Sequence, residues 1–199
     1  MSDLFHESVP DAFVAEVFAV MARANWHTFR LLTKRHGRMR SLLSRPSSRG
    51  NLAHLGPWPL PNVWLGVSAE DQHWWDIRVP ALVATSAAVR FVSAEPLLGP
   101  IDMGLDHGRP SPDWLIIGGE SGIGARPMAL EWVRSMLAQC QQPGIRMVPF
   151  IKQLGSVAGR ELGAGSKGGD WDRWPEDLKC CFGVDAVTGS KSPPNRTSA

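Results

Sequence analysis

Trp114-Leu115-Ile116-Ile117-Gly118-Gly119-Glu120 is an unbroken apolar run that ends in two glycines and a carboxylate. Continuous hydrophobicity of this kind is typical of a strand that is buried on both faces, as strands of parallel sheets are. Four more apolar runs of the chain also end in a polar or charged residue: 29–34, 63–68, 89–95 and 147–152. The sequence therefore predicts five buried strands of one parallel sheet.

The last residues of these five runs lie 25 to 34 positions apart, which is close to the roughly 30 residues of a βα repeat. They are Lys34, Ser68, Glu95, Glu120 and Lys152. Five strands do not close an eight-stranded barrel, and an open doubly wound sheet is an alternative. Polar side chains at the carboxyl ends of the strands favour a partial (β/α) barrel of the TIM type, because active sites of such barrels collect there.

Helical segments are expected between the strands. Ser8 is a candidate cap for a first helix that ends near Asn25, and a short helix is expected at 39–43. Another, beginning near residue 72, should end or kink near Pro80, and a fourth covers about 130–142. We expect residues 1–155 to form the partial barrel, and 156–199 to be a Gly/Ser/Pro-rich extension that is partly disordered.

Composition limits the classes of function. The 199 residues carry a net charge of +2, which gives no support to nucleic acid as a partner, although that partner stays open. We find no apolar stretch of membrane-spanning length and no signal peptide, so we expect a cytoplasmic protein that does not enter a membrane. Three cysteines and six histidines without metal-ligand spacing predict neither a disulfide framework nor a metal site.

The charged strand ends are the candidate catalytic residues. Glu95 and Glu120 would end neighbouring strands, where two carboxylates can separate their pKa values and act as acid and base. Lys34 and Lys152 belong to the same rim. The alternative is that these four residues and Arg126 form structural ion pairs, although burying charge at one rim without use is costly.

The glycine-rich segment 118–127 is the second candidate site. Its backbone amides could form a concave anion site, with Arg126 as a clamp for a carboxylate or phosphate. It does not match the dinucleotide-binding fingerprint, because Pro127 stands where the third glycine is needed. The expected substrate- or cofactor-binding residues are Ser68, Gly118, Gly119, Ser121, Gly122, Arg126 and Gln153.

Several motifs together resemble one family. They are residues 1–6, 32–35, 61–68, 90–99, 118–122 and 150–153, and they occur in the same order there. On them the chain is identified as a member of a phage-associated, three-cysteine-motif family of unknown function, which is similar to radical-SAM proteins. The resemblance covers roughly residues 1–155. It implies a partial (β/α) barrel whose rim residues face a cofactor or substrate.

In full-length relatives the resemblance implies an N-terminal loop of three cysteines that holds a [4Fe–4S] cluster and S-adenosylmethionine. This sequence shows no such loop, and the spacing of Cys140, Cys180 and Cys181 does not fit a cluster motif. We therefore expect the C-terminal portion of a radical-SAM-like barrel, inactive alone, that needs a missing N-terminal segment or a partner protein. The alternatives are a cluster-free enzyme acting on a phosphorylated or nucleotide substrate, and a non-catalytic interaction module of a phage or mobile element.

Overall fold

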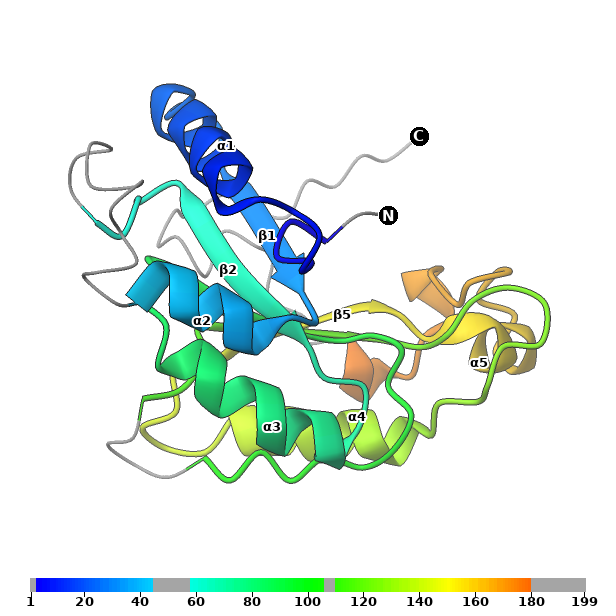
Figure 1. The fold of residues 1–199 in the computed structure, drawn as a ribbon. Coiled ribbons are helices and arrows are strands. Elements are labelled where there is room, and N and C mark those ends of the chain that lie inside the picture. The colour runs from blue at the N-terminus through cyan, green and yellow to red at the C-terminus, as the bar shows by residue number, and fades with distance from the viewer. Residues whose placement is uncertain (1–2, 45–57, 106–109, 180–199) are drawn as a thin grey trace.

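The five predicted strands form one sheet. The structure, a computed structural model, describes residues 3–44, 58–105 and 110–179. All strand pairs are parallel, and the strands lie side by side in chain order (Figure 1): β1 (Phe29–Thr33), β2 (Val63–Ser68), β3 (Val89–Ala94), β4 (Trp114–Gly118) and β5 (Val148–Gln153). A doubly wound sheet needs a reversal of strand order. The five strands show none, so this sheet is singly wound, and it is open.

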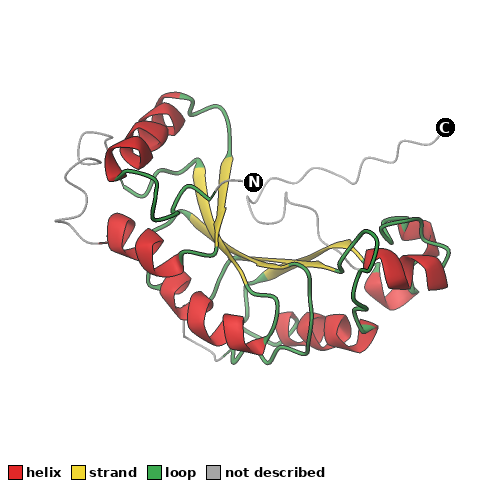
Figure 2. Ribbon diagram, turned by 45° about the vertical axis from the view of Figure 1, so that its right-hand side comes forward, coloured by secondary structure: helices red, strands yellow, loops and turns green. Residues whose placement is uncertain are grey.

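Helices follow or precede the strands throughout: α1 (Asp11–Arg23), α2 (His36–Ser44), α3 (Gln72–Val83), α4 (Leu130–Cys140) and α5 (Gly155–Glu161). Figure 2 shows α2, α3 and α4 along one side of the sheet. Crossovers between parallel strands are nearly always right-handed, and an unreversed strand order then places every crossover helix on the same face. Among the described residues no helix is long and apolar enough to cross a membrane.

Several helices differ from the sequence prediction at their ends, and α2 begins at His36 rather than at residue 39. Ser8 does not cap α1, which begins at Asp11; the Ser8 hydroxyl instead lies 2.8 Å from Nδ1 of His6. Helix α3 continues through Pro80 to Val83. Proline removes one backbone donor from a helix, but its carbonyl still accepts, here from the N–H of Ala84 at 3.1 Å. The helix thus passes through Pro80 and ends three residues beyond it, consistent with the expected end near Pro80.

The sheet has two faces of different composition, because alternate residues of a strand point to opposite sides. The face toward the helices contributes to the main core, with Leu65, Val92, Leu115 and Ile117 fully buried. The opposite face, here called the inner face, carries a separate cluster of Trp64, Phe91 and Trp114, against which Val89, Ile116, Val148 and Phe150 pack.

One glycine of β2 makes room for this aromatic cluster. Gly66 is paired with Phe91 across the two strands. A Cβ at Gly66 would lie 2.4 Å from the Phe91 ring, closer than real Cβ contacts. The absent side chain therefore lets the Phe91 ring pack against β2.

The C-terminal extension is folded as far as it is described. Beyond α5, two short 3₁₀ helices (Trp171–Arg173 and Glu176–Leu178) bring Trp174 and Leu178 into the main hydrophobic core. The indole N–H of Trp174 donates to the carbonyl of Gly168 at 3.0 Å. The predicted disordered tail, Cys180 and Cys181 lie outside the described residues, as does most of the predicted loop at 44–62.

Candidate functional site

The predicted rim residues occur at the carboxyl end of the sheet. Strand alternation gives Lys34, Ser68, Gly118 and Lys152 the same parity as Trp64 and Trp114, so they belong to the inner face. The residues that end the strands thus stand beside the aromatic cluster, on the side away from the helices. Their charged members are held in three ion-paired groups, described in turn.

The first group joins β3 to β5. The carboxylate of Glu95 contacts Lys152 Nζ at 3.0 Å and accepts a hydrogen bond from the Ser93 hydroxyl at 3.0 Å. Gly118 of the intervening strand leaves space for it, since a Cβ there would lie 2.8 Å from Glu95 Oε1. The Lys152 side chain is 57% exposed. This group therefore offers a half-exposed ammonium and a carboxylate that is fixed on two sides.

The second group lies in the loop after β4. Glu120 accepts from Arg126 three times, from Nε at 2.8 Å, from Nη2 at 3.0 Å and from the backbone N–H at 2.8 Å. The hydrogen bonds from Arg126 lower the pKa of Glu120 to about 2. A carboxyl group with such a pKa is ionised at neutral pH and is a poor proton donor there. In this conformation the guanidinium of Arg126 is bonded to Glu120, so its positive charge is already compensated in the absence of a ligand.

The glycines of this loop allow a close passage of two chain segments. A Cβ at Gly119 would lie 2.3 Å from the carbonyl oxygen of Leu154. Gly122 has a φ of +113°, and its N–H donates to Ser156 Oγ at 3.0 Å. Gln153 donates from Nε2 to the carbonyl of Gly119 at 3.0 Å, so its amide fixes the loop. Ser121 is exposed beside these residues.

The third group contains two residues that the sequence analysis did not select. Lys34 contacts Glu70, whose other carboxylate oxygen accepts from Arg78 Nη1 at 3.0 Å. Arg78 also donates to the carbonyl of Ser68 at 2.9 Å, and its guanidinium lies 3.8 Å from the ring centre of Trp74. Burial lowers the pKa of Arg78, and the neighbouring carboxylate of Glu70 opposes that shift.

Glu70 and Arg78 escaped selection because neither ends a strand. Glu70 follows β2 by two residues, and Arg78 reaches the rim from α3. The sequence pattern that could have identified them is an arginine on a predicted helix, eight residues after a carboxylate that stands two residues beyond a predicted strand. Both side chains are more than nine-tenths buried, and buried charges require partners.

The rim shows the ion pairs that were one of the two alternatives left open by the sequence. Glu95 and Glu120 each have a cationic partner, as the ion-pair alternative expects, and Lys34 pairs with Glu70. The side chains of the three outer cations remain between 56% and 59% exposed: Lys34, Lys152 and Arg126. Such groups can bind and orient an anionic ligand.

The described residues do not fit an iron–sulfur cluster. No three His, Cys, Asp or Glu side chains lie together there in a metal-binding arrangement. Cys140 is buried on the apolar side of α4, and burial raises the pKa of its thiol to about 12. An iron–sulfur cluster is bound by thiolates, so Cys140 is a residue of the hydrophobic core and not a cluster ligand.

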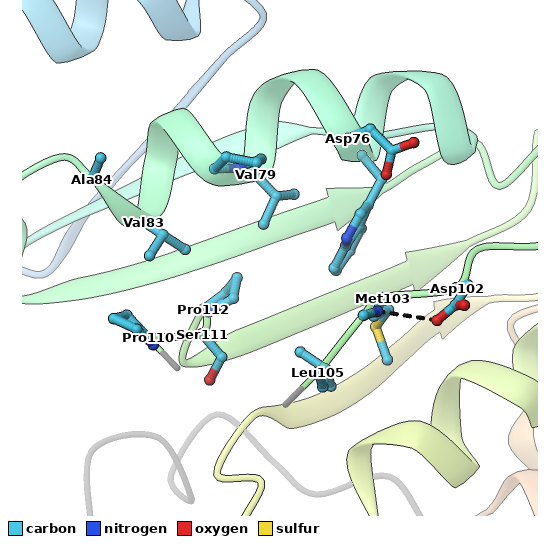
Figure 3. A pocket seen from close by; sticks show the side chains of 13 residues that line it. Asp76, Val79, Val83, Ala84, Asp102, Met103, Leu105, Pro110, Ser111 and Pro112 are labelled. Carbon is cyan, nitrogen blue, oxygen red and sulfur yellow. Dashed lines mark hydrogen bonds between the residues drawn. The ribbon is translucent and has the colours of Figure 1, made fainter. Parts of the chain in front are cut away.

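A pocket lies away from the rim, between α3 and the segment after β3 (Figure 3). It measures about 580 Å³ and its lining is mostly apolar: Val79, Pro80, Val83, Met103, Leu105 and Pro112 among others. It includes none of the predicted site residues. It also borders residues 106–109, which are outside the described part of the chain.

Comparison with known proteins identifies a family but no individual related protein. A family model described as "Protein of unknown function (DUF5131)" matches residues 1–176. No curated protein and no solved structure matches the chain. The match extends beyond the roughly 155 residues that the sequence resemblance covers, through α5 and the first 3₁₀ helix.

Proposed function

The chain belongs to the DUF5131 family, and we propose that it is the C-terminal, substrate-binding portion of a phage-associated, radical-SAM-like barrel. The observation that carries the proposal is the arrangement of the rim. Lys34, Ser68, Glu95 and Lys152 gather at the carboxyl end of a singly wound parallel sheet. Parallel barrels place their active sites at this end.

The inner face supports the same proposal. In a (β/α) barrel the strands carry helices on one side and fill the barrel interior on the other. The inner face here bears the bulky side chains of Trp64, Phe91, Trp114 and Phe150, which is what a barrel interior requires. The charged rim above them would orient a substrate in the mouth of that interior.

The chain's own residues would bind substrate rather than a cluster. A [4Fe–4S] cluster with S-adenosylmethionine supplies reductive radical chemistry in proteins of the resembled kind. Because the described residues do not fit the cluster, its ligands would come from an additional N-terminal segment or from a partner protein. Alone, the chain would then be inactive in radical chemistry.

Anaerobic iron–sulfur reconstitution tests this proposal. We would compare this chain with a version extended upstream through any adjoining in-frame coding sequence, and follow visible absorption and S-adenosylmethionine cleavage. The proposal expects both signals from the extended chain only. If neither protein takes up a cluster, or if this chain takes one up alone, the proposed role is wrong.

The exposed cations favour a second candidate, a cluster-free enzyme that acts on a phosphorylated or nucleotide substrate. Lys34, Lys152 and Arg126 all present half-exposed positive groups at one rim. Turnover of such a substrate by iron-free protein, lost in Glu95→Gln, would favour it. The third alternative, an interaction module, expects binding of a phage or mobile-element partner that survives alanine at Glu95 and Glu120.

A further inference from the structure

The three ion-paired groups of the rim differ in charge balance. Lys152 faces one carboxylate, that of Glu95, and Arg126 faces one, that of Glu120. The third group sets two cations, Lys34 and Arg78, against the single carboxylate of Glu70. Only this last group carries a surplus positive charge.

In the third group the surplus positive charge is accessible to a ligand at Lys34, because Lys34 is half-exposed and Arg78 is buried. Glu70 accepts from Lys34 with one oxygen and from Arg78 with the other. Arg78 is 6% exposed, and it is held by Glu70, the carbonyl of Ser68 and the Trp74 ring, so it cannot reach a ligand. The Lys34 side chain is 56% exposed, and its ammonium has three donors, of which Glu70 takes one.

A recess next to Lys34 has room for a ligand group. It measures about 390 Å³ at the edge strand β1. Leu4, Phe5, Leu31 and Leu32 make much of its lining apolar, and Asp3, Arg30, Thr33, Lys34 and Ser68 are its polar members. The Asp3 carboxylate already accepts from the Thr33 hydroxyl at 2.7 Å and from the backbone N–H of Lys34 at 3.1 Å. With Arg78 and Glu70 behind it, three cations (Arg30, Lys34 and Arg78) stand against two carboxylates (Asp3 and Glu70). Asp71 and Arg35, which also act on the charge of Arg78, add one charge of each sign.

Arg30 gives the recess a second basic side chain. Its guanidinium lies over the Trp64 and Trp114 rings, 5.6 and 5.1 Å from their centres, on the inner face of β1. No salt bridge to Arg30 is found in the described structure. The recess is thus lined by two basic residues, Lys34 and Arg30, together with Ser68.

We propose that this recess binds the anionic group of the ligand, a phosphate or a carboxylate, with Lys34 Nζ as its direct contact. The inference rests on the proposed function, because it assigns one part of the substrate to one part of that rim. It differs from the sequence expectation, which placed the anion at the glycine-rich loop with Arg126. Glu120 compensates the single charge of Arg126 there with three hydrogen bonds, whereas two cations share the carboxylate of Glu70 beside the recess at β1.

NMR titration of the whole chain tests the inference. Inorganic phosphate and acetate are titrated separately at constant ionic strength, and backbone amide shifts give the location and the dissociation constant. We expect shifts at Thr33, Lys34 and Ser68, with phosphate tighter than acetate if the natural group is a phosphate and the reverse if it is a carboxylate. The inference requires only millimolar affinity, which corresponds to about 4 kcal/mol of binding free energy. If neither anion binds the native chain at concentrations up to about 50 mM, the inference is wrong.

Charge-removing variants make the test specific. Lys34→Gln should weaken binding about tenfold, the effect of losing a charge-assisted hydrogen bond. Lys179→Gln, which removes the same charge from the pair with Glu176, should stay within about twofold of the native chain. Glu70→Gln, if folded, should bind phosphate more tightly because it removes the carboxylate that pairs with Lys34.

The opposite result would be equally clear. Native affinity in Lys34→Gln, or shifts that gather at Gly122 and Arg126, would overturn the assignment. In the second case the rim would still be the ligand site and the proposed function would stand. The proposed function is judged separately, by cluster uptake in the extended chain, which a phosphate titration does not touch.

Discussion

At the scale of the residue, Glu120 has the most strongly perturbed carboxyl group of the rim. Its pKa is lowered to about 2 by the hydrogen bonds from Arg126. A lowered carboxyl pKa means that the pair's contribution to stability is present above the ordinary pKa of 4.5 and is lost as the pH falls through about 2. Carbon-13 NMR of the Glu120 side chain should show that midpoint, and Arg126→Gln should return it toward 4.5. A midpoint near 4.5 in the native chain would show that the pair does not persist in solution.

Gly118 decides the position of the Glu95 carboxylate. A Cβ at residue 118 would lie 2.8 Å from Glu95 Oε1, so Gly118→Ala should push the carboxylate away from Lys152 and lower the free energy of unfolding by about 1–3 kcal/mol. Denaturant unfolding measures this change. Gly99→Ala is the matched control, because no atom lies within 4 Å of its added Cβ, and it should stay within about 0.5 kcal/mol. Equal effects of the two substitutions would contradict the packing described here.

At the scale of the element, β2 and β3 depend on the contact between Gly66 and Phe91. The Cβ of Gly66→Ala would meet the ring at 2.4 Å, and overpacking of this kind costs about 1–3 kcal/mol. A double-mutant cycle with Phe91→Leu should recover part of the loss, because the smaller side chain leaves room. In Gly37→Ala on α2 the added Cβ meets nothing within 4 Å, and this control should be neutral or stabilising. Additive losses in the cycle would show that Gly66 acts through something other than the Phe91 ring.

Strands were easier to predict than helix ends. Runs such as 114–118 are apolar on both faces, short and followed by glycine, and together these properties indicate a buried parallel strand. Helix ends depend on which local hydrogen bonds form. Ser8 could cap α1 in sequence, but its hydroxyl lies by His6 instead. Asp71, which precedes a helix that was recognised, does cap α3 by accepting from the N–H of Trp74 at 3.0 Å.

At the scale of the whole molecule, the sequence predicted the sheet and its charged edge but not the pairing of the charges. Strand spacing places Lys34, Glu95 and Lys152 at one end of a parallel sheet, whatever the details of packing. Which cation meets which carboxylate depends on side-chain reach across elements. Arg78 comes from α3 to meet Glu70, and no strand-end pattern contains that contact. The surplus of positive charge at Lys34 could not be predicted from the sequence for the same reason.

The open edge of β1 is a further property of the whole sheet. In the described structure β1 pairs with β2 alone, and Leu32 on it is 41% exposed. Amide hydrogen exchange should therefore be fast at Leu32 and slow at Val92 and Ile117 in the middle of the sheet. In a chain extended by further strands, Leu32 should become protected. Slow exchange at Leu32 in this chain would show that another segment or a second copy already covers the edge.

The most direct test of the account is the location at which small ligands bind. Amide shifts of the native chain would be mapped with a library of small anionic and neutral compounds. We predict that binders shift Ser68, Ser93, Gly118 and Lys152 at the carboxyl ends of the strands. Shifts that gather instead at Val79, Val83 and Leu105, around the apolar cavity beside α3, would contradict the claim that the charged rim is the functional site.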